Sequence, residues 1–287
     1  MNKITLISDT LCDLTQEMYK TYNIRTVPLS VTFKDNPVLF LDGVDITPDD
    51  IYAHVKETGA LPMTGAIPPD TYLNIFKDEL DKGNDVIYIG VGSGISSSLQ
   101  NAVLASKELD ESRIAIVDSQ SLSTGIALLV LKARKLIDEG MKLLDIKKTI
   151  ENLVPLLSVK FSVDGMEYLY KGGRCKGLTF LVGKHLHIHP VIKVTGNKLI
   201  VYKKPRGNYE KAMLEMVNEF KKDLPNIDLD CVFITDSGPT DFMGPKFIEK
   251  EITQYVPAGN LHFTTAGSTV SSHCGPRTIG ILYLLKK

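Results

Sequence analysis

Apolar runs of strand length alternate with helix-sized segments through the first half of the chain. One such pair is Val86–Val91, which is followed by a helical pattern over Ser98–Leu109. Crossovers of this size connect parallel strands, whose sheets carry helices on both faces. The pattern therefore predicts an α/β domain with a mostly parallel sheet. The other expected strands are 4–8, 26–33 and 114–118, and the other expected helices are 13–22, one capped by Thr47, one within IPPDTYLNIFKDEL and 122–139.

The second half has a different pattern, beginning with a hairpin at 193–202 around Thr195-Gly196-Asn197. Gly-Asn suits a tight turn between antiparallel strands. Helices are expected at 209–222 and 245–255, and strands at 230–236, 260–264 and 279–285. This order predicts an α+β domain with an antiparallel or mixed sheet. Pro155 ends the preceding helical pattern, so the predicted domains are 1–158 and 159–287, with room for a cleft between them.

Composition excludes several classes of protein. The 287 residues carry a formal net charge of −1, which gives no electrostatic reason to expect nucleic acid as a partner. They contain no apolar run long enough to cross a bilayer, so we expect a cytoplasmic protein. The four cysteines are scattered without a C-x-x-C pair, which argues against a disulfide framework or a cysteine zinc site.

Three histidines alternate in His185-Leu186-His187-Ile188-His189 and would share one face of a strand. They would suit zinc, but no carboxylate joins them at that spacing and Pro190 follows at once. We therefore expect strand histidines and no metal site.

A loop rich in serine and glycine, GVGSGISSSLQNA, covers residues 90–102 after a predicted strand. Backbone N–H groups at such a strand-to-helix junction favour an anion. The loop matches no named phosphate motif, because Ile95 replaces the third glycine of G-x-G-x-x-G and no lysine is present. Alternatively, Ser97 and Gln100 form a capping box, which leaves Ser93 and Ser96 without a role. Anion binding and simple capping both remain open from these residues.

Ten segments in order resemble the DegV-like fatty acid-binding proteins, the lipid-carrying subunits of bacterial fatty acid kinase. Together they extend from Ile7 to Pro276, nearly the whole chain. The segments are ISDTLCDL, VPLSV, LDGVDIT, MTGAIPP, GISSSLQNA, VDSQSLSTG, YLYKGGR, IHPVIKV, KKPRG and SSHCGP.

The resemblance implies a buried acyl chain whose carboxylate is held near the domain interface by Thr64, Ser96 and His273. Ser97 would then cap the helix while Ser96 faces the ligand. A long-chain fatty acid would be the ligand, with no cofactor or metal. A separate ATP-dependent kinase subunit would act on the carboxylate and pass acyl phosphate toward phospholipid synthesis, with transient membrane contact. The chain has no ATP motif, so it is expected not to be an enzyme.

The sequence also departs from the family pattern. Gly65-Ala66-Ile67 replaces Ser-Gln-Pro, and Ser97-Ser98-Leu99 replaces Gly-Thr-Tyr, which affects pocket width and chain preference. Arg277 replaces a glycine and would either add a charge partner for the head group or alter kinase docking.

Two further interpretations concern the same region. Arg174 and Arg206, with Lys203 and Lys204, form either a solvated surface or a contact for the kinase or for acyl phosphate, and the resemblance favours Arg206 over the lysines. The alternative function is a hydrolase of small acyl esters, with Ser96 as nucleophile and His273 as base. Asp9 or Asp236 would orient the histidine, although Asp9 better suits a brace at the end of the first strand.

Overall fold

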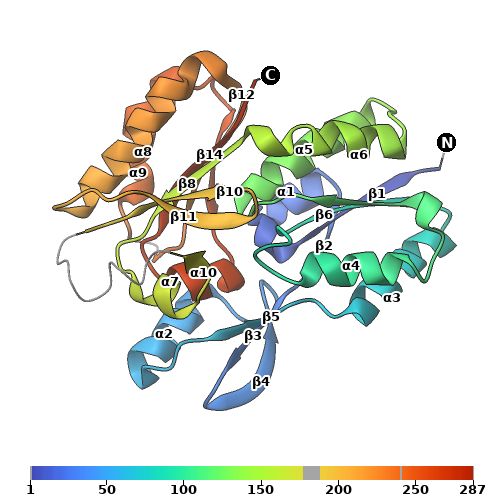
Figure 1. The fold of residues 1–287 in the computed structure, drawn as a ribbon, viewed down its shortest axis with the longest axis horizontal. Coiled ribbons are helices and arrows are strands. Elements are labelled where there is room, and N and C mark those ends of the chain that lie inside the picture. The colour runs from blue at the N-terminus through green and yellow to red at the C-terminus, as the bar shows by residue number, and fades with distance from the viewer. Residues whose placement is uncertain (1, 177–187, 240, 287) are drawn as a thin grey trace.

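Strands of the first half form a parallel sheet in the computed structural model, which describes residues 2–176, 188–239 and 241–286 (Figure 1). The strand order is β2-β1-β6-β7, and every neighbouring pair is parallel. Most residues of the central strands β1 and β6 are buried because helices cover both faces. The predicted parallel sheet is confirmed. The strands are β1 (Ile4–Asp9), β2 (Ile24–Val27), β6 (Asp85–Gly90) and β7 (Ile114–Asp118).

Helices cover the two faces of this sheet (Figure 1). α3 (Pro69–Asp81) and α4 (Ser98–Ser106) pack on one face. α5 (Thr124–Asp138) and α6 (Leu143–Glu151) pack on the other. The short helix α1 (Gln16–Thr21) packs against β2 and begins three residues later than predicted, because Asp13 has a left-handed backbone and Thr15 caps the helix by accepting from the Met18 N–H.

A small antiparallel sheet was not expected. Its order is β4-β3-β5, with β3 (Ser30–Phe33), β4 (Asn36–Leu41) and β5 (Met63–Gly65). The prediction of one strand over 26–33 is therefore wrong, since that run is divided between β2 and β3. Pro28 lies between them and has no N–H to continue a ladder.

Helix α2 (Pro48–Thr58) packs against this small sheet and lies to its left in Figure 1, and its predicted start is confirmed. The Thr47 side chain accepts from the Asp50 N–H, and the Asp50 carboxylate accepts from the Thr47 N–H. This reciprocal pair is a capping box.

The second half forms a seven-stranded mixed sheet, as predicted, in the order β13-β12-β14-β8-β10-β11-β9. α8 (Tyr209–Asp223) and α9 (Gly244–Ile252) cover one face, and α5 lies against the other. The division at residue 158 remains a prediction; β8 begins at Leu157. The strands are β8 (Leu157–Ser162), β9 (Cys175–Lys176), β10 (Val191–Thr195), β11 (Lys198–Lys203), β12 (Ile227–Asp236), β13 (Leu261–Thr265) and β14 (Ile279–Leu285).

One apolar core runs through both halves of the molecule. Leu6 and Ile87 of the parallel sheet belong to the same buried cluster as Val159, Phe161 and Leu282 of the mixed sheet. Helix α5 joins them because its residues 126–130 are buried against both sheets. A second cluster fills the space under α8 and α9.

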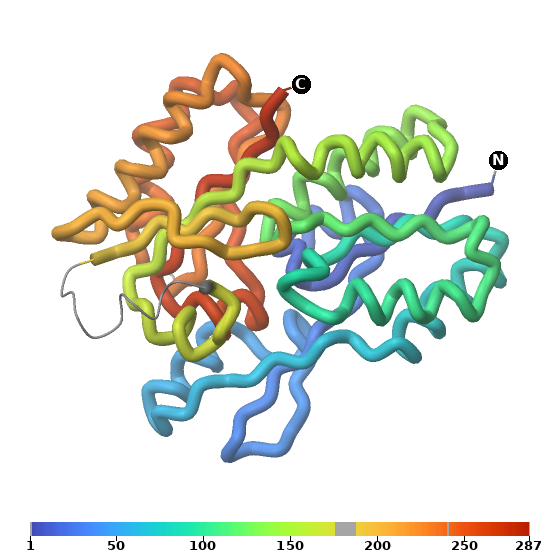
Figure 2. Tube along the Cα trace, in the orientation of Figure 1, coloured from blue at the N-terminus to red at the C-terminus, as the bar shows by residue number. Residues whose placement is uncertain are grey.

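Four chain segments that are distant in sequence meet where the two large sheets adjoin (Figure 2). They are the loop before α4, the turn of the β10–β11 hairpin, and the pair of short helices α7 (Glu167–Lys171) and α10 (Ser268–Cys274). Within the described ranges, no helix is long and apolar enough to span a membrane.

Candidate functional site

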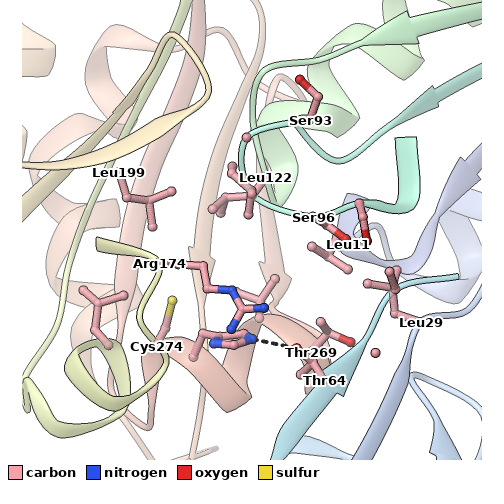
Figure 3. A pocket seen from close by; sticks show the side chains of 18 of the residues that line it. Leu11, Leu29, Thr64, Ser93, Ser96, Leu122, Arg174, Leu199, Thr269 and Cys274 are labelled. Atoms are coloured by element: carbon pink, nitrogen blue, oxygen red, sulfur yellow. Dashed lines mark hydrogen bonds between the residues drawn. The ribbon is translucent and has the colours of Figure 1, made fainter. Parts of the chain in front are cut away.

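A cavity of about 410 Å³ lies at this junction (Figure 3). Its size falls in the range of small-molecule sites, which are roughly 300–1,000 Å³. Much of the wall is apolar, and its polar residues include Thr64, Ser93, Ser96, Arg174 and His273. The apolar residues include Leu11, Leu29, Leu122, Leu169, Leu199 and Val270.

The three predicted head-group residues all line this cavity, although they come from three separate segments. Thr64 lies on β5, Ser96 on the loop before α4, and His273 near the end of α10. The Thr64 Oγ1 and His273 Nε2 atoms are 2.8 Å apart and share a hydrogen bond (Figure 3). The structure thus brings together residues that are up to 209 positions apart.

The His273 imidazole is neutral near pH 7. Burial lowers its pKa from 6.5 to about 4, and the nearby Arg174 guanidinium lowers it further in the same direction. Its Nδ1 atom is buried without a hydrogen-bond partner. A Cβ added to Gly172 would lie 2.6 Å from that atom, so residue 172, just after α7, must be glycine for the imidazole ring to fit. His273 therefore supplies a hydrogen bond and no positive charge.

Ser96 has a double role in the loop. Its Oγ accepts from the Ser98 N–H at 3.2 Å and lies 3.0 Å from the Ser98 hydroxyl, while the residue faces the cavity. The prediction that Ser97 caps α4 is wrong, because its side chain makes no cap hydrogen bond. Gln100 does not cap back either, and its Nε2 donates to the Ser93 carbonyl. The serine side chain that accepts from a backbone N–H at the start of α4 is therefore Ser96, one residue before the predicted Ser97.

Ser93 is held by a contact between the two halves that the sequence did not reveal. Its Oγ donates to Asp118 at 2.6 Å and accepts from Asn197 Nδ2 at 3.0 Å. The same Nδ2 lies 3.0 Å from the Asp118 carboxylate. The sequence Gly196-Asn197 predicted the hairpin turn, and Asn197 has the positive φ of +64° that such a turn requires. The contact of this turn with the serine loop could not be predicted from the sequence.

Two glycines of the serine loop admit this hairpin. A Cβ on Gly94 would lie 2.4 Å from the Asn197 carbonyl oxygen, and one on Gly92 would lie 2.5 Å from its Oδ1. The glycines therefore allow close approach of the second half of the chain.

Asp9 braces the other end of the loop, as predicted. Its carboxylate accepts from the Val91 N–H, the Leu11 N–H and the Tyr88 hydroxyl. Burial raises the pKa of Asp9 to about 6 in spite of these donors.

Helix α10, which carries His273, is held at its start by carboxylates from the first half. Asp42 accepts from the Ser268 and Thr269 N–H groups at 2.7 and 3.2 Å. Asp13 accepts from the Gly267 N–H at 2.8 Å. Burial raises the pKa of both carboxyls. Since each bond spans more than 220 positions of sequence, no local pattern could have predicted this support.

The predicted arginines separate into two groups. Arg174 lines the cavity, and its Nη1 donates to the Gly172 carbonyl at 2.8 Å. Arg206 and Arg277 are exposed and do not line it. The Arg277 Nε lies 3.0 Å from the Asp164 carboxylate, and its guanidinium lies over the Phe242 ring. Arg277 therefore adds no charge beside the head-group residues.

A hydrolase would need a serine bonded to the histidine and an acid behind it. Here His273 Nε2 bonds to Thr64, Ser96 bonds to Ser98, and the other imidazole nitrogen has no partner. The Asp9 carboxylate accepts from the Val91 N–H at the end of β1, and the Asp236 carboxylate accepts from the Gly238 N–H. Among the described residues, the structure therefore shows no Ser96–His273 hydrogen bond and no acid on the free imidazole nitrogen.

The predicted histidine stretch is only partly within the described residues. His185 and His187 lie outside them, and the Nδ1 of His189 lies 3.0 Å from the Asp164 carbonyl oxygen. Among the residues that the structure describes, no three His, Cys, Asp or Glu side chains could jointly hold a metal ion.

A narrow chamber of about 30 Å³ adjoins the cavity against the mixed sheet. Leu122, Val270 and Cys274 line both spaces, and Phe161 and Leu282 close the far side. An elongated apolar group could extend from the polar wall toward this chamber.

Comparison with known proteins identifies relatives along the whole chain. The family model described as "Uncharacterised protein, DegV family" matches residues 3–286. DegV domain-containing proteins from Clostridium perfringens and Caldanaerobacter subterraneus are each 28% identical, over 286 and 287 residues and 99% of both chains. A Thermus thermophilus structure described as "Fatty Acid Binding of a DegV family Protein" has a TM-score of 0.89 at 28% identity, covering 99% of each chain. The chain belongs to the DegV family.

Proposed function

We propose that this protein binds one long-chain fatty acid in the cavity, with the carboxylate on Thr64, Ser96 and His273. The observation that carries the proposal is that all three residues line one cavity with a largely apolar wall, where Thr64 and His273 share a hydrogen bond. The similar Thermus thermophilus protein, described as fatty acid binding, supports the same ligand class.

The chemistry of the wall suits a carboxylate that must later be released. Hydroxyls and a neutral imidazole bind it with hydrogen bonds, and Arg174 is exposed at the cavity wall rather than buried against it. A bidentate buried arginine would hold the anion much more tightly. Affinity then comes from the tail: about 14 methylenes at ~0.8 kcal/mol each give roughly 11 kcal/mol before the costs of ordering.

We further propose that the protein is a non-catalytic carrier in the cytoplasm. It would present the carboxylate to a separate kinase subunit, which transfers the γ-phosphoryl group of ATP to form acyl phosphate and ADP. The carrier would then pass fatty acid or acyl phosphate toward phospholipid synthesis during transient contact with the membrane. Arg174 at the cavity wall would contact the acyl phosphate, and exposed Arg206 would contact the kinase.

Organic extraction of the denatured purified protein, followed by mass spectrometry, tests the ligand. We expect one fatty acid per chain. Ser96→Ala and Thr64→Val should retain much less than Ser112→Ala, a surface control. A well-folded wild type that yields no lipid and binds no added palmitate would contradict the proposal.

Reconstitution with a fatty acid kinase subunit, ATP and palmitate tests the carrier role, with hydroxylamine trapping acyl phosphate as hydroxamate. Arg174→Ala should abolish the product while retaining palmitate, and Arg206→Ala should weaken kinase binding. Lys204→Ala is the matched control for Arg206, because both are exposed in the same KKPRG segment. Product that forms without the kinase would refute the non-catalytic assignment.

A further inference from the structure

One face of the mixed sheet forms the floor of the narrow chamber beside the cavity. Thr235, Gly280 and Phe161 lie opposite one another on β12, β14 and β8. In the next row Leu282 lies opposite Val159. Residues that are opposite one another, or two apart on one strand, share a face of the sheet, and all five line the chamber. β14 is the middle strand of the three, so the floor is bare backbone at its centre, at Gly280.

A side chain at residue 280 would compete for the space of the chamber. A Cβ added to Gly280 would lie 3.2 Å from both Leu282 Cδ1 and Phe161 Cβ, and 3.1 Å from the Lys160 carbonyl oxygen. The two side chains among these neighbours border the chamber. A group of the size of water needs about 10–15 Å³, so the chamber of about 30 Å³ has room for about one or two small groups. One methyl group at residue 280 would therefore take up much of it.

The chamber adjoins the cavity through hydrophobic side chains. Leu122, Val270 and Cys274 are buried and line both spaces, and a buried thiol behaves as a small hydrophobic group. The three head-group residues line the cavity but not the chamber. A ligand held by its carboxylate would therefore bring its tail to the chamber.

The polar groups around the chamber are already hydrogen-bonded within the protein. Its four hydroxyls each have a partner: Ser123 Oγ donates to Asp13, Thr235 Oγ1 bonds to Thr124, Ser237 Oγ donates to the Gly275 carbonyl, and Thr278 Oγ1 donates to the Cys274 carbonyl. The Asp236 carboxylate, which also borders the chamber, accepts from the Gly238 N–H. A methyl group can therefore enter without leaving a buried donor unpaired.

We propose that Gly280 sets the longest acyl chain that the protein binds along its full length. The inference rests on the proposed function and adds its chain-length determinant. With the carboxylate on the head-group residues, the tail passes Leu122 and Val270, and its terminal methyl group lies over the bare backbone of Gly280. A longer chain has no further space there and must bend or remain partly outside.

A series of saturated fatty acids from decanoate to arachidate tests the proposal by calorimetry on delipidated protein. Each buried methylene should strengthen binding about fourfold, up to a length limit beyond which an added carbon gives no gain. Because the chamber holds about one or two small groups, Gly280→Ala should lower this limit by about one or two carbons, and Gly280→Val should lower it further. Decanoate, the shortest acid, should bind wild type and variants within about twofold, because its burial is unchanged.

Two further variants give the opposite result and the control. Phe161→Leu removes bulk from the same floor and should raise the length limit. Ile281→Val lies on the opposite face of β14, in the buried cluster under α8 and α9, and should leave the limit unchanged. Urea unfolding of the empty proteins shows which variants fold.

An unchanged limit in Gly280→Ala, or equal losses for decanoate and the longer acids, would overturn the inference. If Gly280→Val does not fold, Gly280→Ala and Phe161→Leu decide the question, because they change the chamber in opposite directions. A limit that moves the same way in both would overturn the inference too.

The two proposals fail in different ways. If wild type binds palmitate and Thr64→Val does not, while the Gly280 variants keep the length limit of wild type, only the role of Gly280 is wrong. If delipidated, folded wild type binds no fatty acid of any length, the proposed function is wrong and this inference falls with it.

Discussion

Removal of the Asn197 side chain should loosen the serine loop and speed release of the ligand. The amide joins the hairpin of the mixed sheet to Ser93 and Asp118 through two 3.0 Å hydrogen bonds. One goes to a neutral hydroxyl and the other to a carboxylate. Such bonds are worth about 0.5–1.5 and 1.5–3 kcal/mol when buried. Since the site is only partly buried, we expect Asn197→Gly to lower the free energy of unfolding by about 2 kcal/mol.

The choice of substitution matters because Asn197 has φ +64°. Glycine keeps this backbone conformation at little cost, whereas Asn197→Ala should lose about 1 kcal/mol more from strain alone. Lys198→Ala is the matched control, since Lys198 is exposed in the same hairpin. Urea denaturation with tryptophan-independent detection, such as far-UV circular dichroism, measures the differences, because the chain has no tryptophan.

The ligand dissociation rate is the functional measurement. If about 1 kcal/mol of this contact is broken when the cavity opens, Asn197→Gly should release palmitate about fivefold faster. In a double-mutant cycle, Ser93→Ala and Asn197→Gly should show a coupling of about 1 kcal/mol. Equal stability and equal release rates for Asn197→Gly and Lys198→Ala would refute the reasoning that the hairpin holds the loop.

Three further predictions concern the support of His273. Its imidazole resonance in NMR should stay at the neutral position from pH 8 to pH 5 and move near pH 4, and a midpoint near 6.5 would contradict this. Folding stability should fall as the pH drops from about 6.5 to about 4, because over this range the unfolded chain binds a proton on His273 that the folded protein does not. Gly172→Ala should displace the ring and weaken palmitate binding at least tenfold, whereas Gly165→Ala, which has open space around it, should not; equal affinities would refute the contact. Asp42→Asn leaves one carbonyl oxygen for three donors, the Thr10 hydroxyl and the N–H groups of residues 268 and 269, so the free energy of unfolding in urea should fall by about 1–3 kcal/mol. The exposed control Asp81→Asn should lose nothing, and equal stability of the two variants would show that the carboxylate does not hold α10.

Local sequence rules predicted the elements of this fold well. Thr47, Pro48 and Asp50 carry the complete signal for the start of α2, and the run 114–118 is β7 without change. The rules failed at 26–33, where a β-rich pattern continues through Pro28 although the chain changes sheets there. Periodicity reports that a residue suits a strand, and it does not report which sheet receives the strand.

The candidate site divides in the same way. Thr64, Ser96 and His273 were selected through the family resemblance, and the structure places all three at one cavity. The supports of that cavity, such as Asn197 and Asp42, come from contacts between distant segments.

Helix α5 has a consequence for how the molecule can move. Because it is packed against both large sheets, the two halves share one cluster of buried apolar side chains. A rigid opening of one half from the other would expose this shared surface at about 25 cal/mol for each Å² of apolar area. Exchange of a ligand is therefore cheaper through the loops and the hairpin at the cavity mouth. The halves should also unfold in one cooperative transition, and a fragment ending at residue 158 should fail to fold alone.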